Sequence, residues 1–313
     1  MRAAIVRDGS ILVEDRPDPV PAHGELLVRV RSAGLNGADI LQMKGQYPVP
    51  PDSPQDVPGM ELAGEVAAVG PGATRFQVGD RVMAIVGGGG QAELCVVHER
   101  QAMPVPDALD DVAAGGVPEV FTTAHDAIFR QAGLAVGERL LVHGAAGGVG
   151  TAAVQLGAAT GAHVTATVRN PDVRDAVRDL GADVVLDPEE FADGGPYDVV
   201  LELVGAPNLG GNLKALALDG RIVVIGVGAG FKAELNLLAV MGKRARITGS
   251  TLRSRPLEEK ADTARRMERH VLPLFARGLL RVPILETFPL EEAAAAYTRF
   301  QAGGKLGKII LTA

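Results

Sequence analysis

The stretch LLVHGAAGGVGTAAVQLGAATGAHVTATVRN, residues 140–170, constrains the fold more than any other part of the chain. An apolar run that ends at His143 predicts a strand, and the small residues after it predict a tight loop. A helical repeat follows, Gly157 and Gly161 are expected to close that helix, and Val164–Val168 predicts a second strand. A strand–helix–strand unit of this kind predicts a right-handed crossover between parallel strands.

The loop of this unit has the spacing of a dinucleotide-binding turn, with alanine in the first glycine position. Glycines there let the backbone approach a pyrophosphate, and the following helix start offers free N–H groups and positive dipole. A plain tight turn between strand and helix is the alternative, but the strand before and the helix after favour a nucleotide site. The residues expected to bind the cofactor are Ala146, Gly147, Gly148, Val149 and Gly150.

The end of the second predicted strand indicates which nucleotide is bound. An Asp or Glu there would hold a ribose 2′-hydroxyl, but the strand ends in Arg169 and Asn170. A guanidinium suits a 2′-phosphate, because it is always charged and offers a planar fork of donors. We therefore expect NADPH rather than NADH, with Arg169 as the main contact and Arg174 as a second. The alternative is that both arginines are solvated residues at a helix start.

Composition narrows the class of protein. A length of 313 residues favours two domains, and a net charge of −7 argues against a sequence-independent nucleic-acid binder. The single cysteine, Cys95, excludes an internal disulfide and multi-cysteine zinc sites, and we expect it to pack as a small apolar residue. Without a secretory signal or an 18-residue apolar run, the chain is expected to be cytoplasmic, with no membrane partner.

The first third of the chain reads as a small β-rich domain. Leu26, Val28 and Val30 alternate with more polar positions, as in a half-buried strand. The segment 33–58 carries polar residues among prolines and is the first candidate site, although Asn36 and Asp39 can equally cap the helix expected at 38–43. The four glycines at 87–90 are expected to be flexible.

After the nucleotide unit, strands at 183–187, 198–203 and 220–227 alternate with helical stretches, which predicts a parallel sheet. Ligands of such sheets lie at the carboxyl ends of strands. Val204, Gly205, Gly226 and Val227 are therefore expected to face the cofactor, with a plain turn as the alternative role of the two glycines. A long charged helix is expected over 257–277.

Motifs along nearly the whole chain resemble the medium-chain dehydrogenase/reductase superfamily, and specifically its zinc-free quinone oxidoreductase branch. They are GLNGAD, GQYP, PGMELAGEV, VGDRV, VPEVFTTA, HGAAGGVGTAAVQL, GRIVVIG, GSTLRSR and GKIIL. The resemblance implies an α/β chain with a GroES-like, β-rich substrate domain, residues 1–120 and 255–313, and a Rossmann doubly wound parallel-sheet cofactor domain, residues 121–254. Asn36 and Met60 stand where zinc-dependent relatives carry cysteine and histidine, so no metal is expected.

The same resemblance implies further roles. It brings Thr123 near the nicotinamide, places Leu252 in a segment over it, and brings Lys308 close to the cofactor, whereas a surface lysine at a strand end is the alternative for Lys308. It implies a homodimer through an edge strand within 241–255, although that basic run also fits a solvated face. The usual serine and lysine past the second strand are replaced by Asn170 and Asp172.

The expected activity is NADPH-dependent reduction of a small-molecule quinone or enone by hydride transfer. The anion formed on the acceptor oxygen needs a donor, for which Tyr47 is the candidate, and Asn36 would add a hydrogen bond or hold the ribose. Tyr47 is as readily a wall of the pocket. Two other functions stay open: enoyl-thioester reduction, since the GLN…D…YP pattern is similar to enoyl-reductase domains of polyketide and fatty-acid synthases, and NADPH binding without catalysis.

Overall fold

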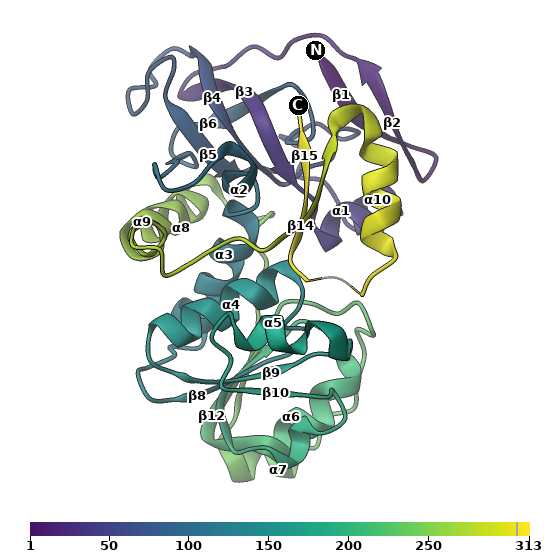
Figure 1. Ribbon diagram of the computed structural model, residues 1–313, viewed down its shortest axis with the longest axis vertical. Helices are drawn as coiled ribbons and strands as arrows, with labels where there is room; N and C mark the ends of the chain where they lie inside the picture. Colours follow the sequence, from purple (N-terminus) through teal and green to yellow (C-terminus); the bar gives the residue numbers. More distant parts are fainter. Residues whose placement is uncertain (305) are drawn as a thin grey trace. The chain divides into compact units, whose positions relative to one another are not determined.

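The computed structural model describes residues 1–304 and 306–313 and divides into two compact units (Figure 1). Unit 1 comprises Met1–Thr122 and Leu252–Ala313, and unit 2 comprises Thr123–Thr251. The two domains expected from the sequence end close to these boundaries. In the described ranges, no helix is long and apolar enough to cross a membrane.

Unit 1 is built on a seven-stranded sheet in the order β14-β15-β3-β4-β5-β7, with β6 also paired to β3, and on a separate β1–β2 hairpin. The long strand β3 shows the expected alternation, since Leu26, Val28 and Val30 are buried and Arg29 and Arg31 are exposed. The chain's last strand pairs with β3. The strands are β1 (Arg2–Arg7), β2 (Ser10–Asp15), β3 (Glu25–Gly34), β4 (Glu61–Val69), β5 (Arg81–Ile85), β6 (Leu94–His98), β7 (Met103–Pro104), β14 (Ile284–Pro289) and β15 (Lys308–Thr312).

Helices of unit 1 cover parts of this sheet, and α10 packs on the hairpin and on β14 and β15 (Figure 1). The helices are α1 (Gly37–Met43), α2 (Asp111–Ala114), α8 (Leu257–His270), α9 (Leu272–Ala276) and α10 (Ala293–Gln301). The expectation of one helix over 257–277 was wrong, because the chain breaks at Val271 between α8 and α9. Pro273 has no N–H to donate to the carbonyl four residues earlier, so the first helix ends before it.

The four glycines at 87–90 are buried, contrary to the expectation of a flexible run. The N–H of Gly89 donates to the Val57 carbonyl at 2.9 Å, and the N–H of Gly90 donates to the Gly59 carbonyl at 3.0 Å. A Cβ on Gly90 would lie 2.8 Å from the carbonyl oxygen of Glu61. These glycines are therefore needed for close packing of backbone against backbone.

Unit 2 is the predicted parallel sheet, with strand order β10-β9-β8-β11-β12-β13 and α4 and α5 on one side, α6 and α7 on the other (Figure 1). Order reverses at β8, the first strand of the unit, as in a doubly wound fold. Its strands are β8 (Arg139–Val142), β9 (His163–Thr167), β10 (Val184–Leu186), β11 (Tyr197–Glu202), β12 (Leu216–Val224) and β13 (Arg246–Gly249), and its helices are α4 (Gly148–Ala159), α5 (Arg174–Arg178), α6 (Leu209–Ala215) and α7 (Leu237–Lys243).

Helix α4 continues past Gly157, and helix α3 leads from unit 1 into unit 2. Gly157 lies inside α4 rather than closing it, and a Cβ there would come within 2.8 Å of the Leu140 side chain on β8. Its role is therefore close packing of the helix on the sheet. Helix α3 (Pro118–His125) runs from unit 1 into unit 2 and continues as a π-helix over Asp126–Gln131. His125 is buried and packs beside the ring of Phe129, like an ordinary helix residue.

Candidate functional site

The predicted nucleotide-binding turn lies between β8 and α4, directly after the first parallel strand of unit 2. Gly144 has a φ of +60°, which favours glycine, and Gly147 is the N-cap of α4. A Cβ on Gly150 would lie 2.5 Å from the carbonyl oxygen of Gly144, so only glycine fits this approach of helix to turn. No side chain caps α4, so N–H groups of its first turn point outward and fit a pyrophosphate.

A buried carboxylate, which the sequence analysis missed, shapes the neighbouring strand end. Glu202 ends β11, and its Oε1 accepts hydrogen bonds from the N–H groups of Val204 at 2.7 Å and Gly205 at 2.8 Å. Its Oε2 accepts from Nδ2 of Asn212 at 2.8 Å, and Oδ1 of Asn212 lies 2.7 Å from Nε2 of His143 at the end of β8. An acid in the apolar run DVVLELV was the signal that could have revealed it.

The glycines at these strand ends have a structural explanation of their own. Gly205 has a φ of +121°, and a Cβ there would lie 2.4 Å from the Gly230 carbonyl. A Cβ on Gly226 would lie 2.4 Å from the carbonyl of Leu203. The two loops thus pack backbone to backbone, which requires glycine whether or not a cofactor lies against Val204 and Val227.

The two arginines expected to read the cofactor differ in their surroundings. Arg169 follows β9, is exposed, and has no hydrogen-bond or ion-pair partner within the described parts of the chain. Arg174 is already engaged, because its Nε donates to the Val168 carbonyl at 3.0 Å and its Nη2 pairs with Asp187 at 2.7 Å. Only Arg169 therefore offers an uncommitted guanidinium for a phosphate.

In unit 1 the expected site contains a buried ion pair. Lys308, at the start of β15, is 3% exposed, so the alternative of a surface lysine was wrong. Its Nζ donates to Oε1 of Glu61 at 2.6 Å, to Oδ1 of Asn36 at 2.8 Å and to the Leu35 carbonyl at 2.8 Å. All three ammonium donors are thus used within unit 1, so Lys308 positions other groups.

Asn36 is fixed by the same ion pair. Its Nδ2 donates to Oε1 of Glu61 at 2.9 Å and to the Gly34 carbonyl at 3.2 Å, so both amide hydrogens are committed. Its Oδ1 accepts from Lys308 and keeps one lone pair. Asn36 can therefore accept a hydrogen bond from a hydroxyl group, but it has no donor left for an oxyanion.

Asp39 has the helix-capping role that the sequence offered as an alternative to a place in the active site. Its Oδ2 accepts from the N–H of Asn36, the N-cap of α1, at 2.8 Å, and its Oδ1 accepts from the N–H of Gly59 at 3.3 Å. Burial raises the pKa of Asp39 to about 6, against the opposing effects of these backbone donors and of Lys308. The Asp39 carboxylate therefore organises α1 and the 58–60 turn.

The surroundings of Asn36 and Met60 bear on the expectation that no metal is bound. The Lys308 ammonium contacts both Asn36 and Glu61, and a cation placed there would meet its charge. Met60, the other position of interest, is 3% exposed and packs in the core. Residues 1–304 and 306–313 contain no group of three or more His, Cys, Asp or Glu placed to hold a metal.

Tyr47 lies in the irregular segment after α1 and is partly buried. Its ring centroid is 5.3 Å from the guanidinium carbon of Arg253, which is itself 4% exposed. Burial and the nearby Glu119 raise the pKa of Tyr47, while Arg253 opposes them, so the phenol stays protonated at neutral pH. Thr123 and Leu252, the other residues expected near the nicotinamide, are buried at 7% and 8% exposure.

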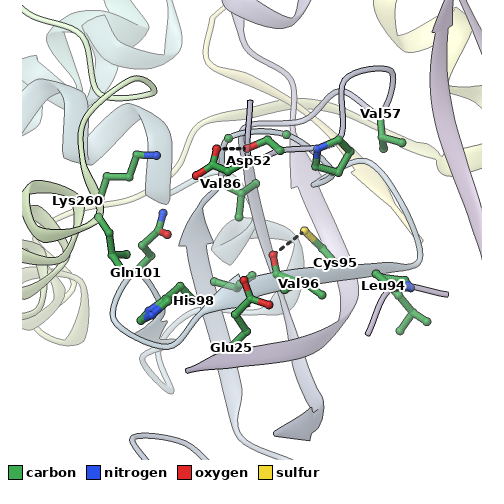
Figure 2. A pocket seen from close by; sticks show the side chains of 18 of the residues that line it. Glu25, Asp52, Val57, Val86, Leu94, Cys95, Val96, His98, Gln101 and Lys260 are labelled. Atoms are coloured by element: carbon green, nitrogen blue, oxygen red, sulfur yellow. Dashed lines mark hydrogen bonds between the residues drawn. The ribbon is translucent and has the colours of Figure 1, made fainter. Parts of the chain in front are cut away.

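Unit 1 also contains a pocket of about 320 Å³, shown in Figure 2. Segments 52–54 and 255–257 line it, together with Cys95 of β6 and Lys260 of α8. Burial lowers the pKa of Lys260 and raises the pKa of the Cys95 thiol to about 12. Lys260 and Gln101 point into the pocket in Figure 2, so its wall combines apolar strand residues with polar side chains.

Comparison with known proteins places this geometry among dehydrogenases. Residues 148–269 match the zinc-binding dehydrogenase family, and residues 22–107 match the alcohol dehydrogenase GroES-like domain. The chain is 32% identical over 306 residues to a quinone oxidoreductase of Rattus norvegicus, covering 94% of this chain and 90% of that protein. It is 35% identical over 307 residues to a mycocerosic acid synthase-like polyketide synthase of Mycobacterium tuberculosis, covering 95% of this chain and 14% of that protein.

Solved structures agree with the sequence comparisons. An alcohol dehydrogenase superfamily protein from Novosphingobium aromaticivorans is 30% identical, with a TM-score of 0.88 over 100% of this chain and 99% of that one. A thermostable alcohol dehydrogenase from Pyrobaculum aerophilum is 27% identical, with a TM-score of 0.87 over 100% and 99% of the two chains. The expected α/β architecture, with a GroES-like domain and a Rossmann-type sheet, is therefore confirmed.

Proposed function

We propose that this chain, an oxidoreductase that belongs to the medium-chain dehydrogenase/reductase superfamily, reduces quinones or other α,β-unsaturated carbonyl compounds with NADPH and without zinc. Members of the superfamily bind a nicotinamide cofactor, which supplies the hydride when bound. The observation that carries the proposal is that the Lys308 ammonium contacts both Oδ1 of Asn36 and Oε1 of Glu61, so that a cation already lies beside the position where zinc-dependent relatives carry a cysteine ligand. Similarity to quinone oxidoreductases over 94% of the chain supports this class of acceptor.

NADPH is proposed over NADH because of Arg169. The guanidinium is exposed and uncommitted at the end of β9, where the ribose of a dinucleotide lies in doubly wound folds. A 2′-phosphate would accept charge-assisted hydrogen bonds from it. Arg174 has a smaller role in this proposal, since Asp187 already neutralises part of its charge.

The side chains of unit 1 are assigned by their free hydrogen-bonding capacity. Asn36 has a free acceptor and no free donor, so we assign it to a cofactor or substrate hydroxyl rather than to the acceptor's anion. Tyr47 keeps its phenolic proton and is assigned to the acceptor pocket, either as donor or as wall. Lys308 holds Asn36 in place and is a positioning residue.

Enoyl-thioester reduction is the second candidate. The 35% identity to a polyketide synthase, at 95% coverage of this chain, favours it, since such a step reduces the same conjugated alkene on a thioester. Only the acceptor distinguishes the two candidates, so residues that hold the cofactor have the same proposed roles in both.

Assembly is proposed to be a homodimer through unit 2. Strand β13 ends the sheet order, and all four of its residues are exposed. Between residues 227 and 247 the same unit exposes the apolar side chains of Val227, Phe231, Leu235, Leu237, Leu238, Met241 and Ile247. An exposed sheet edge beside apolar side chains fits a second copy of the chain. Light scattering at micromolar concentration tests this, and a mass of one chain would contradict it.

The experiment that tests the proposal is NADPH oxidation, followed optically, with a naphthoquinone, a small enone and an enoyl thioester, repeated with NADH. Quinone or enone turnover that prefers NADPH supports the proposal, and thioester turnover alone favours the second candidate. Tight NADPH binding without turnover of any acceptor would indicate a binding protein. In the same assay, an unchanged kcat and KM of Tyr47→Phe would reduce Tyr47 to a wall of the pocket.

A further inference from the structure

Arg253 is a buried cation without an anionic partner. Its Nε donates to the Gly87 carbonyl at 2.7 Å, and its Nη2 donates to Oε1 of Gln42 at 2.6 Å. Both acceptors are neutral, and no carboxylate in the described residues lies within ion-pair distance of it. Burial lowers the pKa of Arg253, while the more distant Asp39, Tyr47 and Glu119 oppose that effect. A guanidinium nevertheless stays charged at neutral pH, so its charge is largely uncompensated.

Two hydrogen-bond donors at this place have no acceptor. Nη1 of Arg253 and Nε2 of Gln42 are both buried and unpartnered within the described chain. The two side chains are hydrogen-bonded to each other, so their spare donors belong to one cluster. Leaving a buried donor unpaired is destabilising, and more so when the group is charged. These two unpaired donors could therefore both be satisfied by a hydrogen-bond acceptor atom of a bound ligand.

We propose that Arg253, oriented by Gln42, binds the carbonyl oxygen of the acceptor and stabilises the negative charge that develops there during reduction. The inference rests on the proposed function and names the group that performs its central electrostatic step. Arg253 is a better candidate for this role than Tyr47, because a charged donor stabilises an oxyanion more strongly than a neutral phenol. The Tyr47 ring, which lies over the guanidinium, then acts as the wall that orients the acceptor.

For an enone, the proposed reaction is reduction of the conjugated C=C bond. A bound reduced nicotinamide would supply the hydride that forms a C–H bond at the β-carbon, and it would itself be oxidised. The π electrons of the C=C bond move to the α-carbon and the carbonyl oxygen, which gives an enolate. Nη1 of Arg253 donates to that oxygen, and a proton from water then completes the α-carbon. Gly87 fixes the guanidinium throughout, since its backbone is itself held in close packing.

The test compares Arg253→Gln and Arg253→Lys with the intact chain, using NADPH and a neutral enone. We expect Arg253→Gln to lower kcat by on the order of 10²–10³, with NADPH affinity unchanged, and Arg253→Lys to recover part of that loss. Arg265→Gln is the matched control, because Arg265 also has an unpartnered buried Nε in unit 1 but, among the described residues, bonds to Ala102 and Glu268 alone. It should leave kcat unchanged.

A merely structural role is separated by chemical rescue. Arg253→Ala is assayed with added guanidinium ion, which should restore kcat in a saturable way without raising Tm to the level of the intact chain. No rescue, or a fall in Tm with kcat retained in Arg253→Gln, would show that Arg253 only fills a site bridged by water and would overturn the proposal. A loss confined to an enone bearing a carboxylate would also overturn it, since Arg253 would then bind a permanent anion.

Failure of the inference and failure of the proposed function give different results. If the intact chain turns over no acceptor, the proposed function fails before any variant is compared. If the intact chain and Arg253→Gln turn over the neutral enone equally well, the proposed function stands and only the role of Arg253 is lost.

Discussion

The proposed cofactor site of unit 2 and the polar site of unit 1 are built in opposite ways. The turn at 144–150 uses backbone atoms of one short stretch, and its specificity lies in where a Cβ cannot fit. The polar site uses side chains from distant segments, among which Lys308 and Glu61 are 247 residues apart. The comparison teaches that the first site depends on backbone space, whereas the second depends on mutual neutralisation of buried charges.

Lys308→Met tests whether the polar site of unit 1 depends on neutralisation of its buried charges, and it has the largest expected effect. It leaves the buried carboxylate of Glu61 without its cation, so we expect a loss of about 3–5 kcal/mol in the free energy of unfolding, measured with urea. Lys308→Met combined with Glu61→Gln should recover much of that loss, because no unpaired charge remains. A single variant within about 1 kcal/mol of the intact chain would show that the pair contributes little.

The contrast also explains what the sequence predicted. Parallel strands and the β8–α4 turn follow from local periodicity and glycine spacing, so they were predicted correctly. The ion pair of Lys308 and the unpartnered donors of Arg253 depend on contacts across the chain, for which no local pattern exists. The run of four glycines at 87–90 wrongly indicated a flexible segment, because these glycines are packed against neighbouring backbone and side chains. The break before Pro273 was visible in the sequence but was not used.

The two units also contain carboxyl groups whose pKa values are shifted in opposite directions, Asp39 in unit 1 and Asp198 in unit 2, so their effects on stability should depend on pH in opposite ways. The raised pKa of Asp39, about 6, means that the folded chain keeps a proton that the unfolded chain has lost above about pH 4. Stability of the intact chain relative to Asp39→Asn should therefore fall by about 2 kcal/mol as pH rises from 4 to 7. Chemical unfolding of both proteins across this range measures it, and a constant difference would contradict the raised pKa.

Asp198 is the control of opposite sign. Hydrogen bonds from Arg139 lower its pKa, so its contribution is present at neutral pH and is lost as pH falls through the acid range. Stability of the intact chain relative to Asp198→Asn should thus be constant above about pH 5 and should decrease below it. If the stability difference between the intact chain and Asp198→Asn instead increased as pH fell, Asp198 would behave like Asp39, and the lowered pKa of Asp198 would be contradicted.

Gly150→Val tests the dependence of unit 2 on backbone space. The added side chain would meet the Gly144 carbonyl, from which even a Cβ would be 2.5 Å away, so helix and turn must separate. We expect NADPH affinity, measured by titration calorimetry, to fall by on the order of 100-fold. Gly242→Val, in α7, is the matched control, since a Cβ there meets no atom within 4 Å, and it should bind NADPH normally.

Arg169→Asp has the smallest expected effect and tests the one charged side chain assigned to the cofactor site. Because Arg169 is exposed and unpartnered, replacing it costs the fold little, and the loss falls on the 2′-phosphate. We expect the ratio of kcat/KM for NADPH over NADH to fall at least about tenfold. Arg178→Asp makes the same charge change on α5, where Arg178 pairs with Asp175, and it should leave the ratio unchanged. Equal ratios in the intact chain and Arg169→Asp would mean that unit 2 recognises its cofactor through backbone alone, which would make the contrast with unit 1 complete.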